Sequence, residues 1–503
     1  MRKIVTLLSA AAIPLAGCTV GPDYRPRSAQ ELGVPPAWSV PVDAAQREDL
    51  AQWWTRFDDP LLQRLVAGAA DGNLDIAQAV ARLKQAREAL AQAGAAYFPT
   101  VNASAGYNRS INIVGGTSQV VLPDGTVTTV SRGNAGSFSL GGNVSYQAGI
   151  FGEVRRGAES ARAQYDASGY NYAAVLISTQ AEIARNYVLA RAAQAQLANA
   201  RASLGLQDDN LEIAGFRVQA GLVSSLDQEQ ARSQRAQTAA TIPSIEASYN
   251  SAVSRLGVLT GQAPGALKGE MEAARPIPVG PASVSAGIPA DVLRQRPDVL
   301  AAERNLAAGT AQIGVAQAAL LPRLSITGSI NTNAPSLGGL FDTVTGSLFG
   351  GLTQLIFDGG AARSRVRSSE AAAEGALYAY KGTVLTALEE VENAIVALNT
   401  AQARAREFQI ALQAADTTAL LARSQYRAGL TDFTTLNQSE GALLSARNGL
   451  TQAQSDQATA LVQLYLALGG GWNSAAIPEA PPAGAPQGAV GQRTPPSMPP
   501  QDR

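Results

Sequence analysis

The sequence contains no histidine and a single cysteine, Cys18, in 503 residues. Histidine-based acid–base catalysis, Ser-His-Asp triads and Cys/His zinc sites are therefore excluded. The 39 basic and 40 acidic residues leave a net charge of −1, which gives no electrostatic case for binding nucleic acid. No cluster of carboxylates suggests Asp/Glu chemistry either, so we expect neither an enzyme nor a cofactor.

Large aromatic side chains are also scarce. They make up 5% of the residues, although 46% of the residues are apolar and much of that fraction is alanine. Such a composition favours long, thin helices that pack closely over one thick core around bulky side chains.

The first residues, MRKIVTLLSAAAIPLAGCTV, have the pattern of a secretory signal: basic Arg2 and Lys3, then an apolar run from Ile4 to Ala16 that is too short to cross a membrane. The small residues before Cys18 resemble a bacterial lipobox. That resemblance implies removal of residues 1–17 and lipidation of Cys18, and the following residue, Thr19, then favours the outer membrane. The alternative is an ordinary signal peptide with a chance cysteine.

Four segments predict β-strands: 98–109, 137–150, 322–333 and 347–357. The first three alternate apolar and polar side chains cleanly, whereas the fourth does so less clearly. Their lengths are close to the roughly 9–11 residues that cross a bilayer when a strand is tilted. Soluble hairpins with one wet face are the alternative interpretation.

Each strand pair is followed by two very long helical stretches with apolar residues seven apart. This period predicts coiled-coil packing. The stretch from about residue 154 to 219 would be roughly 100 Å long at 1.5 Å per residue. The seven-residue rows are Leu176, Ile183, Ala190, Leu197, Leu204 and Leu211, then Leu377, Val384, Val391 and Leu398, then Leu436, Leu443 and Leu450.

The chain also repeats itself. Residues 60–262 and 289–470 each read as helix, strand, loop, strand and helical hairpin, and each hairpin turns at an Ala-Gly-Leu. The first helix is predicted from about Pro60 to Ala96, with Asp58 or Asp59 as its cap. The remaining segments are a lead, 18–59, a Gly/Pro-rich connector, 263–288, and a Pro-rich tail expected to be disordered, 471–503. The two turns contain Gly221 and Leu222, and Gly429 and Leu430.

Four strands per chain are too few to close a barrel, and open edges are not tolerated in a bilayer. Copies of the chain must then complete the barrel, either eight strands from a dimer or twelve from a trimer. The helices should follow the same symmetry as a coiled-coil cylinder. Its far mouth would be lined by the Ala-Gly-Leu turns, which explains why the chain makes the same reversal twice.

The sequence resembles the TolC-like outer-membrane factors, and within them the lipoprotein branch (NodT-like) that serves tripartite RND-type efflux pumps. The matching segments include CTVGPDYRP, LRQRPDVLAAERNLAAGTAQIGVAQAALLPRLSITGSI, LTQLIFDGGAARSRVRSSEAA and YRAGLTDFTTLN. The resemblance implies a homotrimer with a twelve-stranded barrel in the bacterial outer membrane and a helical tunnel in the periplasm. It also implies a passive duct for small toxic compounds or drugs, docked to a periplasmic adaptor and an inner-membrane pump.

The same resemblance implies a periplasmic gate in which Tyr426 bonds to Asp227. Acidic rings of some relatives fall on Thr435 and Gln438, which are uncharged, and an arginine contact falls on Thr431, so these features are absent here. Two alternative functions stay open: a protein-secretion (type I) channel of the same fold, and a structural coiled-coil lipoprotein. The lipobox and the RQRPDV segment favour drug efflux.

Overall fold

The computed structural model describes residues 19–41, 50–111, 113, 117–131, 135–281 and 284–478. The expected signal, Cys18 and residues 479–503 lie outside these ranges. The chain forms two compact units. The first, which we call the sheet unit, contains the described residues of 19–25, 88–164 and 306–376. The second, the hairpin unit, contains the described residues of 26–87, 165–305 and 377–478.

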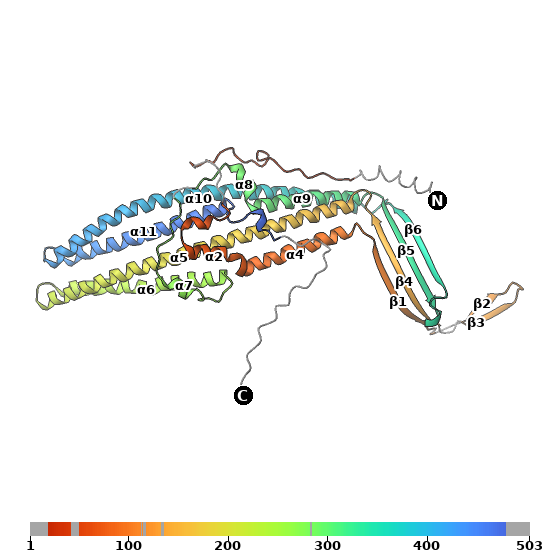
Figure 1. The fold of residues 1–503 in the computed structure, drawn as a ribbon, viewed down its shortest axis with the longest axis horizontal. Coiled ribbons are helices and arrows are strands. Elements are labelled where there is room, and N and C mark those ends of the chain that lie inside the picture. Colours follow the sequence, from red (N-terminus) through yellow and green to blue (C-terminus); the bar gives the residue numbers. More distant parts are fainter. Residues whose placement is uncertain are drawn as a thin grey trace, which may run out of the picture. The chain divides into compact units, whose positions relative to one another are not determined.

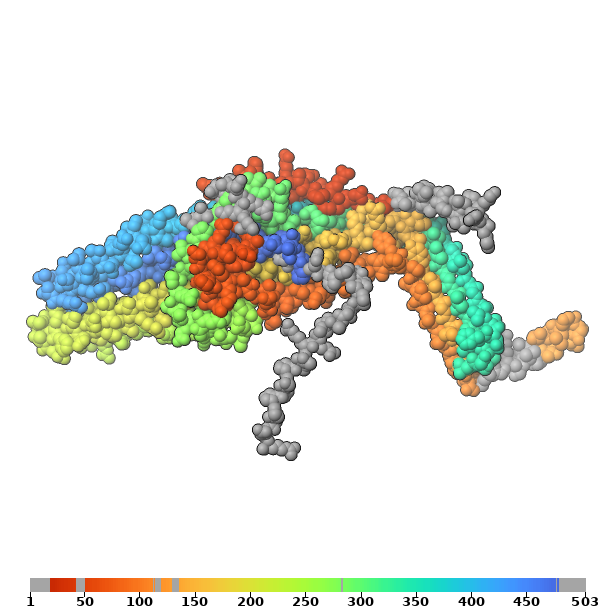
Figure 2. All heavy atoms as spheres, viewed as in Figure 1, coloured from red at the N-terminus to blue at the C-terminus, as the bar shows by residue number. Residues whose placement is uncertain are grey.

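Four strands form one antiparallel sheet in the sheet unit, in the order β1-β4-β5-β6 (Figure 1). They are β1 (Thr100–Ser110), β4 (Ala135–Ala148), β5 (Arg323–Ala334) and β6 (Val344–Thr353). The last strand begins and ends earlier than the 347–357 expected from sequence. Pairing of β4 with β5 joins the two halves of the sequence, which Figure 2 shows as adjoining orange and blue-green surfaces.

The register places the apolar side chains of the four strands on one face, except for Phe349 of β6, which pairs with Thr327 on the other face. Val101 pairs with Val144, Tyr146 with Ile326, and Leu324 with Leu352, while the alternate residues on the other face are mostly Ser, Asn, Thr and Gly. Because side chains alternate between faces, a slip of one residue in any strand would mix the two faces. The apolar face is exposed: Val101 is 72% and Leu352 67% accessible.

A second, two-stranded sheet pairs β2 (Thr117–Val121) with β3 (Val127–Ser131), between β1 and β4 in the sequence. We did not predict this hairpin from the sequence, which suggested only a loop there. Asp124 and Thr126 hydrogen-bond within its turn, and Gly125 has a positive φ of 84°. An aspartate that accepts a hydrogen bond from the backbone two residues on, followed by a glycine with a positive φ, favours a tight turn.

Long helices make up most of the rest of the chain. Two of them, α5 and α10, are 67 residues each, and each is followed by a 35-residue antiparallel partner. None of the helices in the described ranges combines the length and apolar character that a membrane-crossing helix requires. The helices are α2 (Pro60–Ala67), α3 (Ala69–Gly72), α4 (Leu74–Ala95), α5 (Glu153–Gln219), α6 (Ser225–Leu259), α7 (Lys268–Glu272), α8 (Pro289–Gln295), α9 (Pro297–Ala318), α10 (Ala361–Arg427) and α11 (Phe433–Ala467), with short 3-10 turns η2 (Trp53–Phe57), η3 (Leu337–Gly339) and η4 (Ser474–Ala476).

The core of the hairpin unit contains many of the residues of the seven-residue rows. Ile183, Val384, Val391 and Leu436 have no exposed surface, and Leu443 is 3% exposed. Each buried aliphatic side chain of this kind contributes about 1.5–3 kcal/mol relative to an exposed one.

Two expectations from sequence were wrong. The first helix does not run unbroken from Pro60 to Ala96, because Asn73 ends α3 and caps α4 by accepting hydrogen bonds from the backbone of Asp75 and Ile76. Asp59, not Asp58, caps α2. The tail also does not begin at 471: the Trp472 indole donates to the carbonyl of Gln295 at 3.0 Å.

Candidate functional site

The two helix reversals have the same hydrogen-bonding pattern. At the first, the amides of Gly221 and Leu222 donate to the carbonyls of Val218 and Arg217; at the second, Gly429 and Leu430 donate to Tyr426 and Gln425. This pair of backbone hydrogen bonds defines the Schellman motif, which needs a residue in the left-handed conformation directly after the helix. The glycines have φ values of 71° and 74°, so glycine is required for geometric reasons at both turns.

The helices that follow the turns begin with polar caps. Ser224 accepts a hydrogen bond from the amide of Leu226, and Asp432 accepts one from the amide of Thr435 at 2.8 Å. This backbone hydrogen bond lowers the pKa of the Asp432 carboxyl. Leu222 and Leu430 remain 70% and 79% exposed. Each turn therefore projects one exposed leucine from a hydrogen-bonded loop that leads into a capped helix.

Tyr426 lies in an apolar cluster beside these turns and is 1% exposed. Its ring meets Phe433 edge-on, with centroids 6.0 Å apart, and the Arg217 guanidinium lies 4.8 Å from its centroid. Arg217 also donates to the Tyr426 carbonyl. We call the apolar cluster itself, without Arg217, the tip cluster. It joins α5, α6, α10 and α11, and its buried residues are Ala214, Ala231, Ala422, Tyr426, Phe433 and Leu436.

The expected bond between Tyr426 and Asp227 is not formed in this chain. The Tyr426 hydroxyl has no hydrogen-bond partner among the described residues, although it is fully buried. Burial raises the pKa of this phenol; Arg217 acts in the opposite direction and Asp227 adds a smaller increase. Asp227 is partly exposed in the first turn of α6, so it lies near the tyrosine and acts on it only through its charge.

A second buried group joins the two hairpins and was missed by sequence reasoning. The Glu440 carboxylate, on α11, accepts hydrogen bonds from Asn210 on α5 at 2.8 Å and from Arg423 on α10 at 2.9 Å. Glu440 is 6% exposed. We call these three residues the Glu440 cluster. Glu440 lies outside the seven-residue rows named above, and no local pattern in the sequence singles it out.

The other positions discussed for the gate, unlike Tyr426, are not buried. Thr435 and Gln438 are exposed on the first turns of α11, and Thr431 is partly exposed in the turn before it. None of the three belongs to the tip cluster. Their side chains are therefore available to solvent or to another molecule in a single copy of the chain.

The segment after Cys18 is held against the sheet unit by one buried arginine. The Arg156 side chain, 4% exposed, donates to the carbonyls of Val20 and Gly21 and forms ion pairs with Asp23 and Glu159. Cys18 itself lies outside the described residues, but the chain immediately following it is fixed by these contacts.

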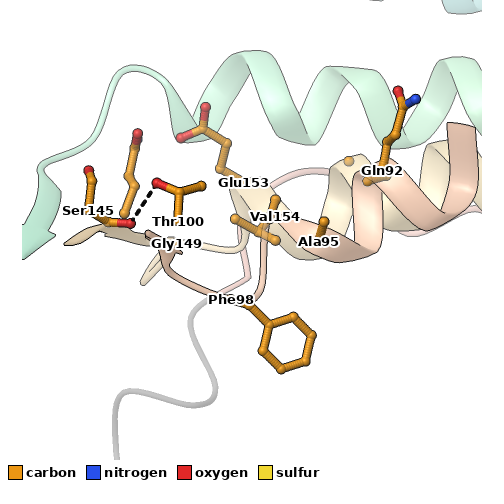
Figure 3. A pocket seen from close by; sticks show the side chains of 12 residues that line it. Gln92, Ala95, Phe98, Thr100, Ser145, Gly149, Glu153 and Val154 are labelled. Carbon is orange, nitrogen blue, oxygen red and sulfur yellow. Dashed lines mark hydrogen bonds between the residues drawn. The ribbon is translucent and has the colours of Figure 1, made fainter. Parts of the chain in front are cut away.

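A pocket of about 610 Å³ lies where α4 leads into β1 and β4 leads into α5 (Figure 3). Thr100 donates to the Ser145 carbonyl at 3.2 Å along its wall. The charge of Glu153 is partnered by Arg323 at 3.2 Å. Phe98 projects its ring away from the other lining side chains and is 71% exposed (Figure 3).

Comparison with known proteins defines the class to which this fold belongs. The family model described as outer membrane efflux protein matches residues 65–262 and 288–470. The chain belongs to this family.

Among relatives, Nodulation protein T of Rhizobium leguminosarum bv. trifolii is 32% identical over 92% of this chain and 96% of its own length. Outer membrane protein OprJ of Pseudomonas aeruginosa is 29% identical over 94% and 97%. Among solved structures, the outer-membrane channel OprN superposes with a TM-score of 0.80 at 32% identity, covering 90% of this chain and all of that one. The open state of the Neisseria gonorrhoeae MtrE outer membrane channel gives 0.75 at 25% identity, covering 90% and 98%.

Proposed function

We propose that this chain is one subunit of a homotrimeric outer-membrane channel, the passive exit duct of a tripartite efflux system. The observation that carries the proposal is the four-stranded sheet, with one continuous apolar face, one polar face and two unpaired edges. Such a sheet is suited to lipid on one side and water on the other.

The edges require more than one copy. β1 and β6 each leave a row of backbone groups without a strand partner among the described residues. Each unsatisfied backbone group costs several kcal/mol in a hydrocarbon environment, so the sheet must close. Three copies would give a barrel of twelve strands.

The two ranges matched by the family model support two sequence repeats, residues 60–262 and 289–470, joined by the connector 263–288. In this proposal each repeat supplies two barrel strands and one helical hairpin. The four hairpin helices of each copy then form part of a tunnel wall in the periplasm.

The duct itself has no energy source, and we assign it no catalytic activity and no cofactor. Relatives are described as efflux pump components, among them the antibiotic efflux pump outer membrane protein ArpC of Pseudomonas putida. Small toxic compounds or drugs are therefore the proposed cargo. An inner-membrane RND-type pump would supply the energy, and a periplasmic adaptor would connect it to this duct. Cys18 would carry an acyl chain that anchors the lead to outer-membrane lipid.

We place the gate at the hairpin tips, which include Gly221, Leu222, Gly429 and Leu430. The tip cluster around Tyr426 and the Glu440 cluster both join the two hairpins of one copy. Opening would require the hairpins to move apart at these contacts. Asp227 contributes charge beside Tyr426, and Thr435 and Gln438 supply an uncharged lining.

Conductance in planar bilayers, together with drug susceptibility of a deletion strain, tests this proposal. We expect discrete conductance steps and a strain sensitised to small drugs but able to secrete its proteins. Loss of secretion without drug sensitivity would instead support a type I protein-secretion channel. No conductance, and a protein that is water-soluble once its acyl group is removed, would support a structural coiled-coil lipoprotein.

A further inference from the structure

A further cavity, of about 720 Å³, lies within the hairpin unit, where the residues after α11 reach the end of α8. Its walls come from the lead, from α5, α8, α9 and α10, and from the residues that follow α11. All of its lining residues belong to the hairpin unit. The proposed channel function makes no use of this cavity, which we call the aromatic cavity.

Three aromatic side chains line the cavity, and two of them are held as a pair. The rings of Tyr170 on α5 and Trp472 meet edge-on, with centroids 6.1 Å apart. The Trp472 indole is fixed by its hydrogen bond to the carbonyl of Gln295 at 3.0 Å. Both rings remain partly exposed. Grooves lined by such rings bind extended, proline-rich segments in several peptide-recognition domains.

The third aromatic residue offers a hydrogen-bond donor. Tyr380 on α10 is 4% exposed, and no described residue hydrogen-bonds to its hydroxyl. Burial raises the pKa of this phenol to about 12, and the charge of Glu303 adds to the increase. The hydroxyl is therefore protonated at neutral pH and can donate to an acceptor inside the cavity. A polyproline II segment supplies such acceptors, because its backbone carbonyls make no internal hydrogen bonds.

The chain leaves the described part of the structure beside the aromatic cavity. Ser474 lines the cavity. Ile477 lies against α5, because a Cβ added at Gly169, next to Tyr170, would meet its side chain at 3.3 Å. Pro478 is the last described residue. The 25 residues that follow, 479–503, are thus attached to the structure close to the paired rings.

The composition of residues 479–503 suits the cavity. Seven of these 25 residues are proline, four of them in the stretch TPPSMPP, residues 494–500. The segment has no aromatic residue, and besides proline its only larger apolar side chains are Val490 and Met498. It cannot build a core of its own, but proline-rich chains favour the polyproline II helix that aromatic grooves recognise. Met498, between two proline pairs, adds a side chain that packs well on aromatic rings.

We propose that residues 495–500 bind in the aromatic cavity of their own chain as a polyproline II segment. Proline rings lie on Tyr170 and Trp472, and a backbone carbonyl accepts a hydrogen bond from the Tyr380 hydroxyl. The 16 connecting residues, 479–494, are rich in glycine and alanine. A flexible linker of that length spans about 20–24 Å on average, which is enough to lead back to a cavity beside its own starting point.

The tether makes even a weak contact effective. A short flexible linker gives a local concentration of the order of 1 mM, so a contact with an intrinsic dissociation constant of about 0.1 mM would be formed in about 90% of the molecules. The docked segment would then join the lead, α5 and α10 at one place. This proposal goes beyond the channel function and does not depend on it.

A disulfide tests the placement. Ser474→Cys, in the cavity wall, is combined with Ser497→Cys, between the two proline pairs; in the matched control Ser233→Cys, exposed on α6, replaces Ser474→Cys. The full-length proteins and each single-cysteine variant are oxidised in detergent and resolved on non-reducing gels. Trypsin then releases the peptides 448–493 and 494–503, since neither contains an internal lysine or arginine. A disulfide between positions 474 and 497 keeps these two peptides joined.

We expect the Ser474 pair to give joined peptides from protein that migrates as a single chain, and the Ser233 pair and the single cysteines to give few or none. Joined peptides found only in bands of two chains would overturn docking within one chain. Crosslinking of the Ser474 pair no greater than that of the Ser233 pair would overturn the placement altogether.

Peptide competition tests the contacts themselves. A fluorescein-labelled peptide of residues 491–503 is titrated, by anisotropy, against the full chain and against a chain that ends at Val490. Because its own segment occupies the cavity, the full chain should bind the peptide about 10-fold more weakly than the shortened chain does.

Substitutions in the shortened chain assign this binding to the cavity. Tyr170→Ala should weaken binding by about 10-fold or more, and Tyr380→Phe by about 2- to 10-fold through the lost hydrogen bond. Tyr378→Ala, two residues away on α10 at a 62% exposed position outside the cavity wall, should leave it unchanged. Equal affinity of the full and shortened chains, equal binding of a scrambled peptide, or no effect of both cavity substitutions would overturn the proposal and leave the channel function standing.

Discussion

Replacing Glu440 with alanine should loosen the contact between the two helical hairpins. In the native chain the carboxylate receives one hydrogen bond from each hairpin, at 2.8 Å from Asn210 and 2.9 Å from Arg423. Alanine removes both and leaves a guanidinium that is only 21% exposed without its counter-charge. Glutamine keeps the volume and one acceptor oxygen but removes the charge.

The free-energy cost of each substitution is set by the burial of Glu440 and Arg423. Removing one partner of a buried ion pair costs about 3–5 kcal/mol, and hydrogen bonds to charged groups contribute about 1.5–3 kcal/mol. Because part of Arg423 reaches solvent, we expect about 2–3 kcal/mol for alanine and about 1–2 kcal/mol for glutamine. Only the bond from Asn210 crosses between the two hairpins, and a hydrogen bond to a charged group contributes about 1.5–3 kcal/mol. Since 1.4 kcal/mol is a factor of ten, the alanine variant should shift the closed-to-open equilibrium by roughly 10- to 150-fold.

Open probability in single-channel recordings measures this shift directly. The expected order is native, then Glu440→Gln, then Glu440→Ala, with Glu407→Gln, an exposed position on α10, behaving as the native protein. A folded alanine variant with native open probability would refute the view that this buried carboxylate holds the hairpins together.

Three further outcomes are expected. Tyr426→Phe should leave stability unchanged or raise it by up to about 1 kcal/mol, because the lost hydroxyl has no partner; a clear drop in melting temperature would mean that it bonds to Asp227 after all. Gly429→Ala should lower the free energy of unfolding by about 1–2 kcal/mol in denaturant titrations, since its φ is 74°, whereas Gly441→Ala, in the exposed interior of α11, should not lower it. Cys18→Ser should abolish palmitate labelling yet leave trimers in outer-membrane fractions, and their loss would contradict barrel closure as the main source of membrane affinity.

The strands and the long helices were predictable because each depends on a local period. Alternation such as that of Val101, Ala103, Ala105 and Tyr107 reflects a sheet with two different environments, and the seven-residue rows reflect helix packing. The turns were predictable for a similar reason, since a glycine after a long helix signals a left-handed residue.

Side-chain partners were harder to predict. The break in the first helix depends on Asn73, whose amide donates to the carbonyl of Leu259, a residue 186 positions away. The surroundings of Tyr426 were inferred by resemblance, and here Arg217 and Phe433 occupy the space around its ring. Such contacts depend on which distant segments meet, and no period in the sequence records that.

The number of chains in the detergent-extracted particle tests the central claim most directly. Native mass spectrometry should give three copies of the mature chain, held together until the sample is heated. A single copy that stays in solution without detergent after removal of its acyl group would contradict the account, because four strands with two open edges cannot line a channel alone.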